Sequence, residues 1–291
     1  MSKSTGSLFG RMLFWATVLI GLPAAALALY WLATLPDVSR LAKHHPTETA
    51  VMEARRAQAK EQGHPLHIKF AWVPLARIAP ALQRAVVAAE DASFFAHEGF
   101  DWEGIKDAAL YNLEVGEFKR GGSTITQQLA KNLYLSSERS LLRKAREALI
   151  TRSLEHHLTK KQILELYLNV AEWGQGVFGA EAAARHHFGK SAEDLTIEEA
   201  ALLAAILPSP RRYDPIRHTA YLTRRQRHIV RWLERGNGRK AASINRISPE
   251  NLEVVPVEYW PLTTTDSGAM WIRRLRCSPA LQKSPTRGGS I

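Results

Sequence analysis

The chain has 291 residues, 45% of them hydrophobic and 23% charged, with a formal net charge of +11 and one cysteine. A chain of this length can bury one substantial core. The single cysteine, Cys277, excludes an intrachain disulfide framework and a cysteine-rich zinc site. The positive charge favours anionic partners such as nucleic acid, phosphorylated ligands or an anionic membrane surface, and charge alone does not choose among them.

The first predicted element is an apolar segment, residues 12–33, which carries no charged side chain. A helix of that length is long enough to cross a bilayer, and Trp15 and Trp31 lie near its ends as interfacial aromatics would. The alternative is a cleaved signal peptide, because the residues at 26–28 read Ala-Leu-Ala. The apolar run continues past that site, which favours an uncleaved anchor. Basic residues flank the segment on both sides, so the flanking charges do not decide its orientation.

Helical periodicity dominates the chain from Ile78 onward, and strand signals are few. An extended piece at 67–75 precedes this region, and the predicted helices lie near 50–61, 78–90, 101–114, 124–134, 138–157, 160–170, 177–187, 196–206 and 218–235. Residues 34–238 are therefore expected to form one mainly α domain. The remaining residues, 239–291, are rich in Ser, Pro, Gly and Arg, and we expect this tail to be poorly ordered.

Two adjacent carboxylates, Glu90 and Asp91, follow the apolar helix predicted at 78–90. The negative end of the helix dipole and desolvation by Val86 and Val87 both oppose a charge on Glu90. We therefore expect its pKa to be raised toward the range of a general base. Asp91 would add like-charge repulsion or hold a divalent metal. Taken alone, the stretch is more typical of a solvated acidic helix end than of a catalytic site.

A second polar stretch, GGSTITQQLAKN, opens the helix predicted at 124–134. Thr124 to Gln127 form a capping-box pattern. Thr124, Gln127 or Gln128, and Lys131 share one helix face, and beside the positive end of a helix they suit a pyrophosphate or sugar ligand. The alternative is an ordinary exposed helix face. The GxxxxGK[ST] spacing of a nucleotide-binding loop is missing, so ATP chemistry is not implied.

A third polar set lies on the next predicted helix. Arg143 and Glu147 are four residues apart, which predicts a helical ion pair worth about 0.2–0.5 kcal/mol. The functional alternative is that Arg143 and Lys144 bind a diphosphate, with Glu147 as a second carboxylate nearby.

Taken in order, the motifs EDASFFAHEG, GGSTITQQLAKN, RKAREALI, KKQILELYLN and EWGQGVFGAEAAARHHFGK resemble those of the bacterial peptidoglycan glycosyltransferases, glycosyltransferase family 51. The pair Arg224-Arg225 resembles a further motif of that family. The similarity extends from about Thr47 to Leu233, and the unbroken stretch GGSTITQQLAKN is its most specific part.

The resemblance implies a mainly α, lysozyme-like domain with a small membrane-touching jaw, and elongation of glycan chains from lipid II. Glu90 matches the general base that deprotonates the 4-hydroxyl of the acceptor GlcNAc as undecaprenyl diphosphate leaves. Asp91 matches an acid near the diphosphate and a divalent metal, Mg²⁺ or Mn²⁺, and Glu147 matches a glutamate that orients the site. No organic cofactor is expected. The residues matched to substrate contacts are Ser123, Thr124, Gln127, Gln128, Lys131, Asn132, Arg143, Lys144 and Arg225.

The same resemblance places residues 1–11 in the cytoplasm, residues 12–33 in the inner membrane and residues 34–238 in the periplasm. Expected partners are lipid II, the growing glycan strand, the inner membrane and division or elongation proteins, and no nucleic acid. One alternative is a lysozyme-like enzyme that cleaves peptidoglycan, which would need neither a diphosphate-binding set nor an anchor. Another is an inactive membrane-anchored scaffold that binds lipid II. A bifunctional penicillin-binding protein would need SxxK and KTG motifs, which the sequence lacks.

Overall fold

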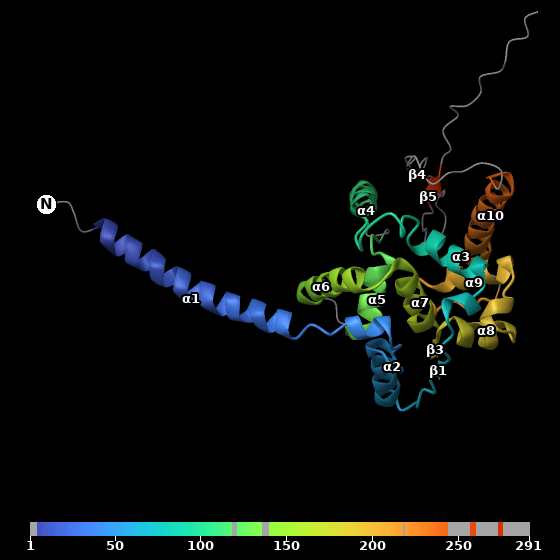
Figure 1. Cartoon of the computed structure of the whole chain (residues 1–291), viewed down its shortest axis with the longest axis horizontal. Helices are drawn as coiled ribbons and strands as arrows, with labels where there is room; N and C mark the ends of the chain where they lie inside the picture. The colour runs from blue at the N-terminus through green and yellow to red at the C-terminus, as the bar shows by residue number, and fades with distance from the viewer. Residues whose placement is uncertain are drawn as a thin grey trace, which may run out of the picture.

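A long apolar helix, α1 (Thr5–Ala33), projects away from a body built mainly of helices (Figure 1). Within it, Gly10–Ala33 has a mean hydropathy of 2.1 and is not covered by the rest of the protein. This helix is long and apolar enough to cross a membrane. The computed structural model describes residues 5–117, 121–135, 140–217, 219–243, 257–259 and 273–275.

The body confirms the mainly α fold class. Its helices are α2 (Ala50–Glu61), α3 (Pro80–Glu90), α4 (Trp102–Val115), α5 (Ile125–Tyr134), α6 (Leu141–His157), α7 (Lys160–Val170), α8 (Ala180–Phe188), α9 (Ile197–Ile206) and α10 (Ala220–Ser243). Short 3-10 turns lie at Ser39–Ala42, Leu75–Arg77 and Ala192–Asp194. Several helices begin at side-chain caps that accept a backbone N–H three residues on, namely Thr49, Asp101, Thr124, Ser140, Thr159 and Thr196.

Three short strands form a small sheet beside α8, in the order β1 (Lys69–Phe70), β3 (Val177–Phe178), β2 (Glu172–Gly174). β1 pairs parallel with β3, with Lys69 opposite Val177, and β2 pairs antiparallel with β3, with Glu172 opposite Phe178. The expected extended piece at 67–75 contains β1.

The helix predicted at 177–187 was wrong at its start. Residues 177 and 178 belong to β3, and α8 begins only at Ala180. Gly179 between them has a φ of +88°, which is outside the helical region, and a Cβ there would lie 2.7 Å from the carbonyl oxygen of Asn169. Only glycine permits this turn from strand to helix.

The C-terminal helix also differs from its prediction. α10 continues to Ser243 rather than ending near 235. Beyond it, β4 (Val257–Tyr259) and β5 (Arg273–Leu275) pair antiparallel. The expectation of a poorly ordered tail over 239–291 falls mostly on residues outside the described part.

The core lies around α9, in which every residue from Ala200 to Ile206 is buried. α9 packs against α3 and α10, while α5 packs against α6 and α7. A helix that is apolar on all sides is expected at the centre of a domain. α3 is thereby held against two helices that come from later parts of the chain.

A buried amide ties α7 to the segment that leads into α3. Asn169 is fully buried, and its Nδ2 donates to the carbonyl oxygens of Val73 (2.9 Å) and Glu165 (2.8 Å). Its Oδ1 accepts the backbone N–H of Val73 at 3.0 Å. These bonds use both ends of the buried amide, so its polar atoms have hydrogen-bond partners.

The end of α1 is joined to the body through α6. The guanidinium of Arg146 donates to the carbonyl oxygen of Thr34, and its Nη1 lies 3.4 Å from the hydroxyl oxygen of the same residue. A cation at the C-terminal end of a helix complements the negative end of its dipole.

Candidate active site

Glu90 is the last residue of α3, and its side chain is only 10% exposed. Burial is the largest cause that raises the pKa of this carboxyl, and the neighbouring Asp91 adds to it. Arg225, Gln128 and Lys131 act in the opposite direction, and the net effect is a raised pKa. The direction expected from the position of Glu90 is confirmed. A raised pKa suits a group that must take up a proton near neutral pH.

Three helices converge on this carboxylate. From α5, Gln128 Nε2 donates to Glu90 Oε2 at 3.0 Å. From α7, the hydroxyl of Tyr167 donates to Gln128 Oε1 at 2.9 Å. From α10, Arg225 Nη2 lies 3.5 Å from Glu90 Oε1. That second oxygen is buried and accepts no hydrogen bond from the part of the chain that the structure describes. Such a group is costly and marks a candidate functional site.

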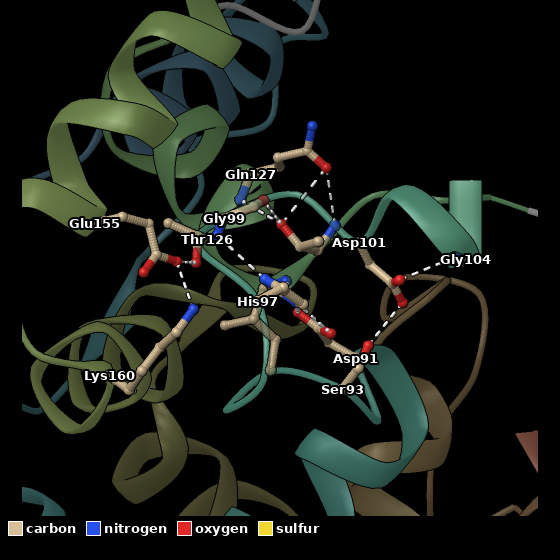
Figure 2. A network of polar contacts seen from close by, with 12 residues as sticks. Asp91, Ser93, His97, Gly99, Asp101, Gly104, Thr126, Gln127, Glu155 and Lys160 are labelled. Carbon is tan, nitrogen blue, oxygen red and sulfur yellow. Dashed lines mark hydrogen bonds and ion pairs between the residues drawn. The ribbon is translucent and has the colours of Figure 1, made fainter. Parts of the chain in front are cut away.

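Asp91 lies in a separate network, which Figure 2 shows from close by. Its side chain is 2% exposed, and its oxygens lie 2.9 and 3.1 Å from His97 Nε2. One of them also accepts the backbone N–H of Ile125 at 3.0 Å. The N–H of Gly99 donates to His97 Nδ1 at 3.1 Å, so Nδ1 is the acceptor and Nε2 carries the proton donated to Asp91. Asp91 thus joins the end of α3 to the first turn of α5.

The N-terminus of α5 forms the predicted capping box. Thr124 Oγ1 accepts the N–H of Gln127 at 3.2 Å, and Gln127 Oε1 accepts the N–H of Thr124 at 3.0 Å. The hydroxyl of Thr124 also donates to the carbonyl oxygen of Gly99 at 2.7 Å. Both side chains are buried, and the hydroxyl of Thr124 is used for hydrogen bonds within the protein. Of the two glutamines, Gln128 is the one that reaches Glu90.

A second charged cluster surrounds Glu147 on α6. Glu147 is 3% exposed and accepts hydrogen bonds from Arg143 Nη1 at 2.7 Å and from Lys144 Nζ. Lys144 Nζ also lies 3.4 Å from the hydroxyl of Ser123. The predicted Arg143–Glu147 ion pair is confirmed. This cluster brings the loop before α5 against the first turns of α6.

Lys131 on α5 connects the two clusters electrostatically. Desolvation is the main cause that lowers the pKa of its ammonium group, and Arg143 and Lys144 lower it further. Glu147 and, more weakly, Glu90 oppose this lowering. A single face of α5 therefore carries Gln128 toward the carboxylate of Glu90 and Lys131 toward the basic cluster. Asn132 is half-buried one position after Lys131.

Residues 59–234, more than half of the chain, match the sequence model of a protein family described as transglycosylase. The chain belongs to this family. Three relatives carry the name biosynthetic peptidoglycan transglycosylase. One from Herminiimonas arsenicoxydans is 45% identical over 221 residues, which cover 76% of this chain and 94% of the relative. One from Methylobacillus flagellatus is 46% identical over 219 residues (75% and 95%), and one from Bordetella pertussis is 48% identical over 228 residues (76% and 94%).

Asp91, where the family resemblance implied a divalent ion, does not by itself form a metal site in the described part of the chain. Both carboxylate oxygens of Asp91 already accept hydrogen bonds from the protein. Among the described residues, no group of three or more His, Cys, Asp or Glu side chains gathers to hold a metal ion. Hard cations such as Mg²⁺ need several oxygen ligands together, and the described side chains gather no such set around Asp91.

One residue of the transglycosylase site, Tyr167, was not predicted from the sequence. Tyr167 stands in the apolar helix pattern KKQILELYLN, and its aromatic ring fits a core position as well as a site position. The available signal was its hydroxyl, because a buried tyrosine usually needs a hydrogen-bond partner. That partner, Gln128, is 39 residues away in the sequence, so only the fold identifies it.

Proposed function

We propose that this transglycosylase polymerises the glycan strands of peptidoglycan from lipid II. The observation that carries the proposal is the buried carboxylate of Glu90, with its raised pKa, and the cluster of cations around Glu147, which one face of α5 connects through Gln128 and Lys131. The names of the relatives support the reaction class.

In the proposed reaction, Glu90 takes the proton from the 4-hydroxyl of the GlcNAc of an incoming lipid II. The oxygen attacks the anomeric carbon at the end of the growing chain, and the bond from that carbon to undecaprenyl diphosphate breaks with its electron pair on the diphosphate. A base with a raised pKa accepts the proton more readily once it is ionised. The chain grows by one disaccharide unit, and the proton remains on the carboxyl until solvent removes it.

The developing charge on the diphosphate needs fixed cations. We assign this role to the cluster around Glu147, because Arg143 presents a planar group suited to phosphate oxygens and Lys144 is partly exposed beside Ser123. Lys131 adds a third positive charge. Glu147 holds the first two side chains in place, which agrees with an orienting role rather than proton transfer.

We further propose that α1 anchors the enzyme in the inner membrane, with the catalytic domain in the periplasm. The lipid tail of the substrate then stays in the bilayer while its sugars enter the site. Large apolar side chains on α4 and at the start of α6 are exposed and suit the membrane interface, namely Trp102, Leu110, Leu113, Leu141 and Leu142. Contacts with division or elongation proteins belong to the same proposal.

A requirement for Mg²⁺ or Mn²⁺ stays part of the proposal as well. The described side chains do not gather into a metal site, so we place the ion with the diphosphate of the substrate, whose oxygens are the ligands that Mg²⁺ prefers. Asp91→Asn is then expected to leave the Mg²⁺ concentration that gives half-maximal activity unchanged.

The deciding experiment is polymerisation of labelled lipid II by the purified full-length chain in detergent with Mg²⁺, beside Glu90→Gln. We expect the wild type to make a polymer that lysozyme degrades, and the variant to lose about 10²–10⁴-fold in rate, the usual contribution of a general base. Degradation of finished glycan without polymerisation would instead favour the hydrolase. Binding of lipid II with neither activity would favour the scaffold.

A further inference from the structure

We propose that Tyr167 and Arg225 are positioning residues for Glu90, which they hold from two sides in the orientation and charged form that the transfer requires. Tyr167 acts through Gln128, and Arg225 acts directly. The inference rests on the proposed role of Glu90 as the base, and neither residue needs to touch the substrate to fulfil it.

The first side of this arrangement is a hydrogen-bonded chain from α7 through α5 to α3. Tyr167 is 1% exposed, and its hydroxyl donates to Gln128 Oε1 at 2.9 Å. Because that oxygen is committed to Tyr167, the amide nitrogen of Gln128 must point the other way, toward Glu90 Oε2 at 3.0 Å. Without the tyrosine hydroxyl, the amide can turn its oxygen toward the carboxylate, and two acceptors would then face each other.

The second side is the guanidinium of Arg225, which is 6% exposed on α10. Its Nη2 lies 3.5 Å from Glu90 Oε1, too far for a strong hydrogen bond but close for two buried charges. Its Nε is buried without a hydrogen-bond partner among the described residues. A buried guanidinium needs a counter-charge, and Glu90 is the carboxylate that supplies it. This burial argues for positioning rather than the substrate contact that the family resemblance implied.

The groups that face Glu90 come from three other helices and from the residue that follows α3. Lys131 and Gln128 lie on α5, Arg225 and Tyr221 on α10, Tyr167 on α7, and Asp91 directly after α3. Among those that lower the pKa of Glu90, Arg225 has the largest effect and Gln128 the next. Without Arg225, burial and Asp91 still raise the pKa of Glu90, and mainly Gln128 and Lys131 remain to lower it. The pKa of Glu90 should then rise further, and less of the carboxylate is ionised at a given pH.

The test is the pH profile of kcat/KM for lipid II polymerisation by the full-length chain. Arg225→Gln is expected to move the acid limb of the profile to higher pH, and Arg225→Lys, which keeps the charge, to move it less. Tyr167→Phe removes only an oxygen atom from a buried ring. We expect a smaller shift in the same direction and about a fivefold loss of kcat, the value of one hydrogen bond.

Two matched variants control for nonspecific effects. Tyr134→Phe removes the hydroxyl of a tyrosine that is partly buried, and Arg227→Gln removes an exposed cation from the same helix as Arg225. Both are expected to keep the wild-type profile. If Tyr167→Phe and Arg225→Gln give the same acid limb as these controls, the proposal is wrong, even when their rates are lower.

A second readout separates this proposal from the proposed function. The carboxyl stretch of Glu90, obtained as the infrared difference between each protein and its Glu90→Gln counterpart, follows protonation without any turnover. A titration that moves to higher pH in Arg225→Gln and in Tyr167→Phe supports positioning even when the wild type fails to polymerise lipid II. Unchanged infrared titrations in both variants would overturn it while polymerisation remains intact.

Discussion

At the scale of single residues, the main feature is a carboxylate at a position where its ionisation is energetically unfavourable. Glu90 combines burial, an acidic neighbour and an oxygen without a hydrogen-bond partner among the described residues. Together these features raise the pKa of Glu90, so its ionised form is less favourable in the folded protein than in the unfolded chain. Proteins tolerate such a cost mainly at functional sites.

This cost predicts a pH-dependent gain in stability for Glu90→Gln. Because the folded-state pKa is raised, the folded protein binds more protons than the unfolded chain between the ordinary glutamate pKa of 4.5 and the folded-state pKa. The wild type therefore loses stability as the pH rises through that window. Glu90→Gln lacks the carboxylate, so at neutral pH it should melt at a higher temperature, and below about pH 4 the difference should vanish.

The measurement is thermal unfolding of both proteins in detergent across pH, with Glu98→Gln as the control because its side chain is 84% exposed. A Glu90→Gln variant that melts below the wild type at neutral pH would show that the partners of Glu90 outweigh its burial.

At the scale of elements, the site depends on how the end of α3 meets the start of α5. Asp91 accepts the N–H of Ile125 in the first turn of α5 and the Nε2 proton of His97. Thr124 adds a bond to the carbonyl oxygen of Gly99. These contacts place Gln128, one turn further along α5, beside Glu90.

Asp91→Ala would leave two buried donors, the Ile125 N–H and His97 Nε2, without an acceptor. Since each such loss costs about 1–3 kcal/mol, we expect the free energy of unfolding to fall by about 2–4 kcal/mol. Denaturant unfolding monitored by circular dichroism measures this, and Glu98→Ala in the same loop is expected to stay within about 0.5 kcal/mol of the wild type. An equally small effect for Asp91→Ala would mean that Asp91 does not brace the two helices.

At the scale of the whole molecule, an apolar helix projects from a helical body (Figure 1). Arg146 contacts Thr34 at the junction between them. Arg146 lies on α6, the helix that also carries Glu147 and its cations. The cluster assigned to the diphosphate therefore belongs to the helix that contacts the end of the anchor. This arrangement matches a substrate whose lipid tail lies in the membrane and whose diphosphate lies next to that tail.

The proposed orientation can be tested with Cys277, the only cysteine of the sequence. We expect a membrane-impermeant maleimide to label it in intact spheroplasts, because the proposal places everything after α1 in the periplasm. In the matched control, Ser2→Cys combined with Cys277→Ser, labelling should appear only after lysis. The reverse pattern would contradict the proposed orientation.

Much of the fold follows from local pattern. The helices around Glu90, Gln128 and Glu147 were predictable because apolar spacing and caps such as Thr124 and Ser140 act within a few residues. The start of α8 was not predictable, since β3 pairs with β1, which is more than a hundred residues earlier in the sequence. A two-residue strand carries too little local signal to override a helical pattern.

The sequence by itself determined the family, the order of the motifs, the apolar N-terminal helix and the direction in which the pKa of Glu90 moves. These follow from residue type and from neighbours within one or two turns of a helix. Only the tertiary structure decided that Gln128 rather than Gln127 faces Glu90 and that Asp91 braces α5. It also decided that Arg225 approaches the carboxylate from α10 and that Tyr167 approaches Gln128 from α7. The physical reason is that hydrogen bonds and charges act over a few ångströms in space, and packing alone brings distant parts of the chain that close.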